Sequence, residues 1–444
     1  MGSLCRVAVA FRVGIIPLLA AAMTFSIEAF YGGAWAQTPS PPPGYYDVPP
    51  GYDFPADKQT LEQYRRSGNT SAERTHVWNV FAGMTQPTPD NKYAIFETWY
   101  AEAEAFANGP TPQAVGPRRV VRQFRLPQQF VGVPGQPALE AAGDALLSEV
   151  MFNFANYNHI RAKQLYLQSQ LNNLQQSGDK DPEIANDTTI PAFPAAAISL
   201  KTIWWPVARD APTPMPIWDP ANDASNPTGR HPYSSWKRAV VIDPTRTNIP
   251  PGETTNVDFH GPRPNSHVVG LDQFHYVVVD AQTAANAMNN PRLQQFVADV
   301  FGSNRPLQEG DYLVFAGSHM TTKEIDDWVW ATFWWHDRPD AGPYAADRTD
   351  KVTGVWRNYL MSTSYDLSLP TESDGSPHVA FNPWLEAGFP SGILSNCMNC
   401  HHRASSPNPG FLPIFRGNPD PNDRAYAAGV LRTDFLWSIP DNAN

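Results

Sequence analysis

In the first half of the chain, apolar residues recur at three- and four-residue steps. Two runs show this spacing: Tyr93, Phe96, Tyr100, Ala103 and Phe106, and then Leu147, Val150, Met151, Phe154, Tyr157 and Ile160. Such spacing places side chains on one face of a helix. A Gln- and Asn-rich stretch with apolar residues between Leu165 and Leu174 extends the pattern to Gly178, a residue type that often ends helices. The pattern therefore predicts a helical region over residues 59–185.

From about residue 190 the apolar positions alternate, and β-branched and aromatic residues become frequent. A period of two is typical of β-strands. Pro, Gly, Asn and Asp turns separate the predicted strands Ile198–Val207, Trp236–Ile242, His275–Val279, Tyr312–Phe315 and Trp328–Trp335. Because these strands do not alternate with helices, the pattern disfavours a Rossmann or thioredoxin fold and favours a sandwich-like or barrel-like β-rich domain over residues 190–369.

Both flanks of this region are rich in residues that break regular structure. Residues 37–58 are Pro-rich and predict an extended linker or surface strap. Residues 370–444 are rich in Pro, Asn and Gly and predict a loop-rich segment with short ordered pieces. The predicted fold class is α+β, with a helical N-terminal region, a β-rich middle and a loop-rich C-terminal segment.

Composition limits the classes of function. With 42% hydrophobic residues the chain can bury a large core, which excludes disorder throughout. The 45 prolines argue against a helical bundle or a coiled coil. The formal net charge of −11 gives no electrostatic footprint for nucleic acid, and anionic lipid is an equally poor partner.

The first 36 residues have the features of a secretory signal peptide. Arg6 and Arg12 give a basic start, an apolar stretch follows from Val13 to Ile27, and Ala34-Trp35-Ala36 fits the small-x-small cleavage rule. We expect cleavage after Ala36 and a periplasmic or secreted protein; a retained anchor is the alternative. No other stretch approaches about 18 apolar residues, so no membrane span is expected after cleavage.

The residues Cys397-Met398-Asn399-Cys400-His401 form a C-x-x-C-H motif. Two thiols about one helical turn apart can each form a thioether with a vinyl group of one haem, and the following histidine lies beneath the iron. In this motif and its exported setting the chain resembles c-type cytochromes. The resemblance implies one covalent haem c, attached to Cys397 and Cys400, with His401 as the proximal iron ligand.

Three other interpretations of the motif are weaker. A Cys397–Cys400 disulfide would close a tight loop that stabilises little, and it would leave His401 unexplained. A thioredoxin-like redox pair requires a βαβ context that the pattern lacks. A zinc site needs four ligands, and the motif supplies too few of them without a distant residue.

Small cytochromes c carry the motif near their start and a methionine ligand after it. Here the motif lies late in the chain, and no methionine follows it. A sixth iron ligand must therefore come from upstream, or the site is open. In its late position the motif also resembles those of cytochrome c′ and cytochrome P460. Cytochrome c′ is a helical bundle, which disagrees with the predicted β-rich middle of this chain. Cytochrome P460 is β-rich and has an open distal face. As a whole, the chain looks more like exported bacterial cytochrome c family proteins with one C-terminal haem motif.

Several upstream residues are candidates for the sixth ligand. They are His275, His319, Met320, His336 and Met361. Asp337 is placed to orient the imidazole of His336, as carboxylates beside metal ligands do. For each candidate the alternative is a packed core methionine or a hydrogen-bonded surface histidine, and the sequence does not choose among them.

Other residues are candidates for the surroundings of the haem. Arg403 and Arg416 could pair with haem propionates, and the apolar segment Pro409–Phe415 could cover a haem edge. Trp328, Trp330, Trp334 and Trp335 predict a central strand that is apolar on both faces, either as core packing or as a wall against the haem.

The favoured function is electron transfer by an exported monohaem cytochrome with a redox partner protein, and not catalysis. The first alternative is a haem enzyme with an open distal site, a peroxidase-like or P460-like oxidoreductase, since a carrier needs far fewer residues. The second is a haem-free binding or structural protein. No G-x-S-x-G elbow, P-loop, H-E-x-x-H or dinucleotide fingerprint is present.

Overall fold

The computed structural model describes residues 40–111, 117–127, 145–182, 186–366, 379–408 and 429–444. Residues 41–444 form one compact unit, so the predicted regions are parts of one body. The predicted signal peptide, residues 1–36, lies outside the described residues. Among the helices of the described ranges, none combines the length and the apolar character needed to cross a membrane.

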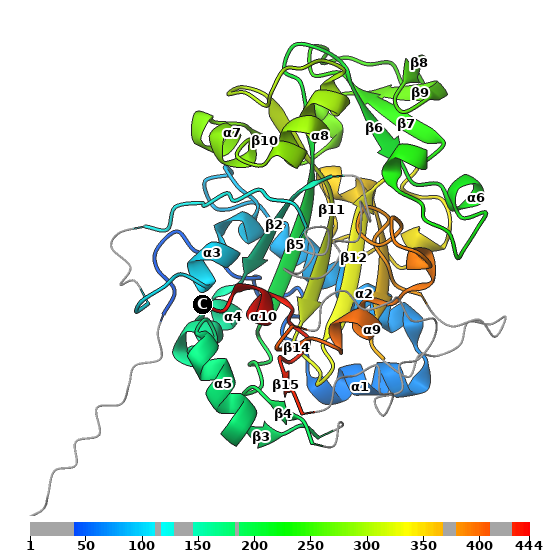
Figure 1. Cartoon of the computed structure of the whole chain (residues 1–444). Helices are drawn as coiled ribbons and strands as arrows, with labels where there is room; N and C mark the ends of the chain where they lie inside the picture. Colours follow the sequence, from blue (N-terminus) through cyan, green and yellow to red (C-terminus); the bar gives the residue numbers. More distant parts are fainter. Residues whose placement is uncertain (1–39, 112–116, 128–144, 183–185, 367–378, 409–428) are drawn as a thin grey trace, which may run out of the picture. The chain divides into compact units, whose positions relative to one another are not determined.

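A seven-stranded sheet forms the centre of this unit (Figure 1). Its strands in spatial order are β1 (Tyr100–Ala101), β2 (Leu147–Phe152), β5 (Ile198–Val207), β11 (Tyr312–Thr322), β12 (Val329–Trp335) and β13 (Tyr359–Ser364), and β10 (Tyr276–Val278) also pairs with β11. All these neighbours are antiparallel. With helices mainly in the N-terminal part, the α+β class is confirmed.

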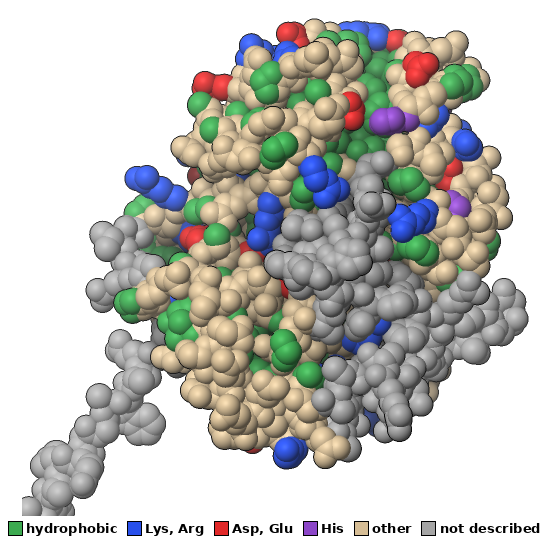
Figure 2. Space-filling model, viewed as in Figure 1, with side chains coloured by type: hydrophobic (Ala, Val, Ile, Leu, Met, Phe, Trp, Pro, Cys, Tyr) green, Lys and Arg blue, Asp and Glu red, His purple; other side chains and the backbone are tan. Residues whose placement is uncertain are grey.

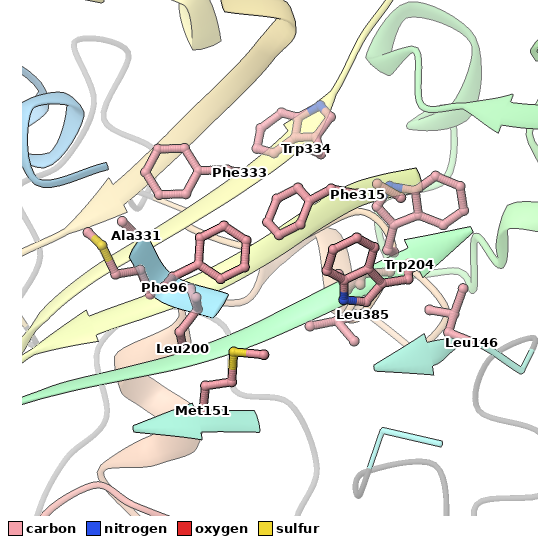
Figure 3. Packing of buried hydrophobic residues seen from close by; sticks show 14 of the residues in the cluster. Phe96, Leu146, Met151, Leu200, Trp204, Phe315, Ala331, Phe333, Trp334 and Leu385 are labelled. Carbon is pink, nitrogen blue, oxygen red and sulfur yellow. The ribbon is translucent and has the colours of Figure 1, made fainter. Parts of the chain in front are cut away.

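Helices cover one face of this sheet. On that face α2 (Thr70–Met84) places Phe81 against Phe333 of β12, with ring centroids 4.0 Å apart and rings nearly parallel. Figure 3 shows Phe333 in the same apolar layer as Phe96 and Phe315. The helix α1 (Lys58–Ser67) packs beside α2. We call this side of the sheet the α2 face.

The C-terminal segment covers the opposite face. It includes α9 (Cys397–His401), which Figure 1 shows in front of the sheet, and α10 (Ser438–Asn442). Trp330 of β12 and Phe333 lie three positions apart on one strand, so they point to opposite faces. The ring of Trp330 contacts His401 of α9, with centroids 4.3 Å apart. We call this side the α9 face.

Two four-stranded sheets and several short helices complete the described fold. One sheet has the order β6 (Thr213–Ile217), β7 (Arg238–Ile242), β9 (Pro262–Val269) and β8 (Thr254–Asp258); the other has β14 (Ser405–Ser406), β15 (Leu431–Arg432), β4 (Thr188–Thr189) and β3 (Asp179–Lys180). The helices are α3 (Glu102–Ala105), α4 (Phe154–Ala162), α5 (Gln168–Ser177), α6 (Pro220–Asp223), α7 (Ala281–Ala287) and α8 (Pro291–Phe301).

The predicted strands are found, with one large extension. Ile198–Val207 has the predicted bounds, whereas the strand that starts at Tyr312 continues to Thr322 and includes His319. The helical prediction over Leu147–Phe152 is wrong, because these residues form β2. This strand lies between β1 and β5 and is buried at five of six positions, so its apolar residues do not alternate. The helix begins only at Phe154, after the N-cap Asn153.

The described part of the Pro-rich segment is a strap on the body and not a free linker. Tyr45 is buried, and its hydroxyl oxygen accepts a hydrogen bond from the backbone N–H of Phe154 at 2.6 Å. Further along, the N–H of Ala56 donates to Glu324 Oε1 at 2.7 Å. The strap therefore ties the start of α4 to the far end of β11.

A buried charged cluster lies on the α2 face. Glu149 of β2 is 2% exposed, and its carboxylate accepts a hydrogen bond from the N–H of Gln123. Nearby Arg122 is paired with Glu97, whose carboxylate lies 3.1 Å from His275 Nε2. Burial raises the pKa of Glu149 from 4.5 to about 7, against the attraction of Arg122.

Replacing Glu149 with glutamine is expected to stabilise the protein above neutral pH. The raised pKa means that the folded state favours the neutral form of Glu149. The contribution of Glu149 to the free energy of unfolding is therefore fully present below pH 4.5 and is lost as the pH rises through 7. A glutamine side chain cannot ionise, so the variant should gain about 1–3 kcal/mol at pH 8 and little at pH 4. Urea unfolding at both pH values measures this, and an equal change at both would contradict it.

Candidate functional site

The helix α9 carries the motif and is fixed at its first residue. The side chain of the N-cap Asn396 accepts a hydrogen bond from the N–H of Met398 at 3.0 Å, so the helix begins at Cys397. Asn396 Nδ2 also donates to Ser364 Oγ of β13 at 2.9 Å. The N–H of Cys397 donates to the carbonyl of Ala380 at 3.0 Å. These bonds hold the motif against the sheet.

The two motif cysteines are free thiols on one side of this helix, since residues three apart share a helix face. Cys397 is 5% exposed; its Sγ lies 3.2 Å from the carbonyl oxygen of Ala380 and 3.7 Å from His319 Nδ1. Cys400 is half-buried, and Arg403 Nη2 lies 3.8 Å from its Sγ. Burial raises the pKa of both thiols, so both are protonated at neutral pH.

His401 has a defined tautomer. Its Nδ1 lies 2.8 Å from the carbonyl oxygen of Phe435, and a carbonyl can only accept, so Nδ1 carries the proton and donates it. Burial lowers the pKa of His401 to about 3, which keeps the imidazole neutral. The lone pair therefore resides on Nε2. Metal-binding histidines are commonly oriented in this way, with the other ring nitrogen bonded to a backbone carbonyl.

A polar band crosses the α9 face beneath the motif. Its residues share one line of strand register and are Lys201, His319, Thr332 and Ser362. His319 Nε2 lies 3.1 Å from Glu386 Oε2, which also accepts a hydrogen bond from the N–H of Asn382 at 2.7 Å. Burial lowers the pKa of Lys201 to about 8. Ionisable groups of the sheet thus lie next to Cys397 and near His401.

The structure brings one of the five sixth-ligand candidates, His319, next to the motif. Met320 follows His319 in the strand and so points to the α2 face. Met361 pairs with Phe333 and lies on that face too. His275 lies beside Glu97, also on the α2 face. His336 follows β12, where its Nδ1 accepts a hydrogen bond from the N–H of Arg338 at 2.9 Å.

The residues predicted around the haem are only partly described. Arg403 is buried beside Cys400, whereas Arg416 and Pro409–Phe415 lie outside the described residues. Of the four clustered tryptophans, Trp330 packs on His401. Trp335 stacks instead on Phe274, and Trp334 contacts Tyr344. The strand β12 is buried at all seven positions, as predicted for a central strand.

Sequence reasoning missed two partners of the motif. Glu386, which holds His319, lies in an irregular stretch and has no spacing that distinguishes it from other acidic residues. Phe435 acts through its backbone carbonyl, which no residue type reveals. A further contact comes from Trp437, whose Nε1 donates to the carbonyl of Cys400 at 3.2 Å.

The residues of α9 include the groups that a covalent haem would take from the chain. Within the described ranges, no three His, Cys, Asp or Glu side chains are grouped as a metal-ligand set. A haem c requires from the chain two thiols and one imidazole with a free lone pair. Cys397, Cys400 and His401 supply these three groups on one side of a short helix.

No protein-family model, curated protein or solved structure matches this chain.

Proposed function

We propose that this protein is an exported monohaem c-type cytochrome that transfers electrons to or from a partner protein. Cys397 and Cys400 would hold the haem through thioether bonds, and His401 Nε2 would bind the iron. The haem supplies a one-electron centre, and the chain supplies ligation, burial and a docking surface. Signal cleavage after Ala36 would deliver the chain to the periplasm or the medium, where such attachment takes place.

The observation that carries the proposal is the hydrogen bond from His401 Nδ1 to the carbonyl of Phe435. It fixes the tautomer and ring orientation and leaves Nε2 free to act as a ligand. A histidine in a simple Cys–Cys clip would have no need of this arrangement. The bond from Trp437 Nε1 to the Cys400 carbonyl holds the end of α9 in the same way.

The surroundings of His401 are suited to tuning the reduction potential. Trp330 covers its ring on the sheet side, and burial of this kind raises the potential of a haem by excluding water.

Figure 2 shows several Lys and Arg side chains (blue) on the viewed face, so this surface is not uniformly acidic despite the net charge of −11. A partner need not be basic to dock there.

An absorption spectrum of the exported protein tests the proposal. After expression with haem-maturation machinery, we expect a covalent haem whose reduced spectrum is sharp, low-spin and unchanged by carbon monoxide, because a six-coordinate iron has no open position. A colourless protein would refute the haem assignment and leave the binding or structural alternative.

A second candidate is a haem enzyme with an open distal site. It is favoured by the side chains of the α9 face, where His319, Lys201 and Glu386 lie near the motif and where the candidate methionines Met320 and Met361 do not point. Such ionisable groups suit proton transfer to a small bound substrate. A high-spin spectrum that shifts with carbon monoxide would favour this candidate over the electron carrier.

A further inference from the structure

The turn that carries the Phe435 carbonyl has an unusual backbone. Asp434 and Phe435 have φ angles of 46° and 67°, so both lie in the left-handed region. The N–H of Leu436 donates to the carbonyl of Thr433 at 3.0 Å, which closes the turn around them. Turns with a positive φ at both central residues favour Asn, Asp and Gly there. Asp434 fits this preference, whereas the bulky Phe435 is strained in this conformation.

The side chain of Asp434 fixes this turn to the central sheet. Its Oδ1 accepts hydrogen bonds from Lys323 Nζ at 2.6 Å and from Trp328 Nε1 at 3.1 Å, and its Oδ2 accepts one from the N–H of Phe193 at 3.2 Å. These donors lie at the end of β11, at the start of β12 and ahead of β5. The side chains of Asp434 and Lys323 are each 9% exposed, so water competes little for their bond. A strained conformation persists only where its surroundings determine it, and these three bonds do so.

The strained turn lies beside the histidine of the motif. The Phe435 carbonyl accepts the hydrogen bond from His401 Nδ1, and the ring of Phe435 lies next to that of Trp330, with centroids 6.3 Å apart. The N–H of Thr433 also donates to the carbonyl of Ala404, just after α9. The direction of a carbonyl follows from the backbone dihedrals, so a Phe435 with the usual negative φ would aim this oxygen elsewhere. His401 would then lose the acceptor that determines its tautomer.

We propose that Asp434 is a positioning residue for His401. Through its three hydrogen bonds Asp434 holds the turn in the left-handed conformation, and the turn presents the Phe435 carbonyl to His401 Nδ1. The lone pair of His401 is thereby kept on Nε2. The use of that lone pair to bind a haem iron rests on the function proposed above, whereas the action of Asp434 on the tautomer does not.

A purely structural role is the alternative for Asp434. A buried carboxylate that pairs with a lysine also affects the stability of the fold, so a loss of stability alone does not separate the two roles. The state of the His401 ring separates them, because an imidazole without a fixed partner exchanges between its two neutral tautomers.

The test determines the His401 tautomer by nitrogen NMR of the haem-free, full-length chain, labelled at its histidines. The pH is about 7.5, where an ordinary imidazole is neutral. Protonated and unprotonated ring nitrogens give widely separated signals, and their couplings to the ring protons distinguish Nδ1 from Nε2. The signals that are missing in His401→Gln identify this residue among the 11 histidines. In the wild type we expect the proton on Nδ1 alone.

Asp434→Ala is expected to abolish the single Nδ1–H form of His401. Alanine makes none of the three hydrogen bonds and disfavours a positive φ, so the turn should relax. Both ring nitrogen signals should then shift to intermediate values, as expected for exchange between the tautomers. Asp434→Asn can keep two of the bonds through its Oδ1 and tolerates the left-handed conformation, so it should retain the wild-type tautomer.

Lys323→Met gives a second route if Asp434→Ala does not fold. It removes one of the three donors to Asp434 and should shift the His401 signals in the same direction, but less. An unchanged tautomer in Asp434→Ala would overturn the inference. If that variant does not fold, an unchanged tautomer in Lys323→Met would overturn it instead.

The matched control is Asp187→Asn. Asp187 is another buried carboxylate that anchors the C-terminal segment, but it does so ahead of the turn, at Gly429, Val430 and Arg432. Asp187→Asn should lower the stability and leave the His401 tautomer unchanged. An equal shift of the His401 signals in this control would also overturn the inference, because it would report a general loosening of the segment and not positioning.

Failure of this inference can be separated from failure of the proposed function. Covalent haem is measured on the matured wild type, and the tautomer is measured on haem-free protein. Absent haem with an Asp434-dependent tautomer would refute the cytochrome and support the positioning role. Normal haem with an Asp434-independent tautomer would support the cytochrome and refute the positioning role.

Discussion

Cys397→Ser combined with Cys400→Ser is expected to abolish all haem that stays with the polypeptide through denaturation. A serine hydroxyl does not form the thioether, so any haem left in the variant would be held only by His401 and by packing. The fold should persist, because the hydroxyl can still donate to the carbonyl of Ala380 as the Cys397 thiol does. Mass spectrometry of the denatured protein measures the loss, and circular dichroism checks the fold.

Cys5→Ser is the matched control for this experiment. It removes the remaining cysteine of the chain, which lies in the predicted signal peptide, and should leave haem attachment unchanged. Haem that stayed covalently bound at the wild-type level in the double variant would contradict the assignment of the motif.

Asp187→Ala is expected to give the largest loss of stability among the changes considered. Asp187 is fully buried; its Oδ2 accepts a hydrogen bond from Arg432 Nε at 2.7 Å, and its Oδ1 accepts from the N–H groups of Gly429 and Val430 at 2.6 and 3.1 Å. Removing it takes one carboxylate from the buried guanidinium of Arg432 and removes the acceptor of two backbone N–H groups, a change that costs about 3–5 kcal/mol. Urea unfolding of the haem-free protein measures the difference.

The control for this prediction is Asp326→Ala. Asp326 forms an ion pair with Lys58 at 2.7 Å, but the two side chains are 80% and 53% exposed. Exposed pairs contribute about 0–1 kcal/mol, so this variant should unfold close to the wild type. A similar, small loss in both variants would contradict the structural role assigned to Asp187.

Local sequence patterns correctly predicted two kinds of element. The first kind has one buried and one exposed face, and the second kind has turn or capping residues at its ends. The strand Ile198–Val207 was predicted because β-branched and aromatic residues end at clear turn residues. The helix α5 ends at Ser177, just before Gly178, as the sequence indicated. The helix predicted over Leu147–Phe152 is wrong because a strand that is covered on both faces shows no alternation of apolar and polar residues. Its apolar residues also continue without a break into those of the helix that follows.

For the site, the sequence revealed the motif and named His319, Trp330 and Arg403 among several candidates, but it did not show which candidates lie beside the motif. C-x-x-C-H is contiguous and can be read directly. The contact of Cys397 with His319 depends on the packing of α9 on β11, and the contact of His319 with Glu386 joins residues far apart in the chain. Among the candidate ligands, residue type alone could not separate His319 from Met320; the difference arises from the direction in which each points from β11.

The order of the sheet has a consequence for when the motif becomes buried during folding. β5 pairs with β11 across a long insertion, so the central sheet has high contact order and should form slowly. The partners of α9 are His319 and Trp330 on the completed sheet and the carbonyl of Phe435, near the end of the chain. The motif can be buried only after the central sheet has formed and the segment that contains Phe435 has packed against α9. A nascent chain would therefore keep its two thiols accessible for most of its folding time, which suits the covalent haem attachment proposed above.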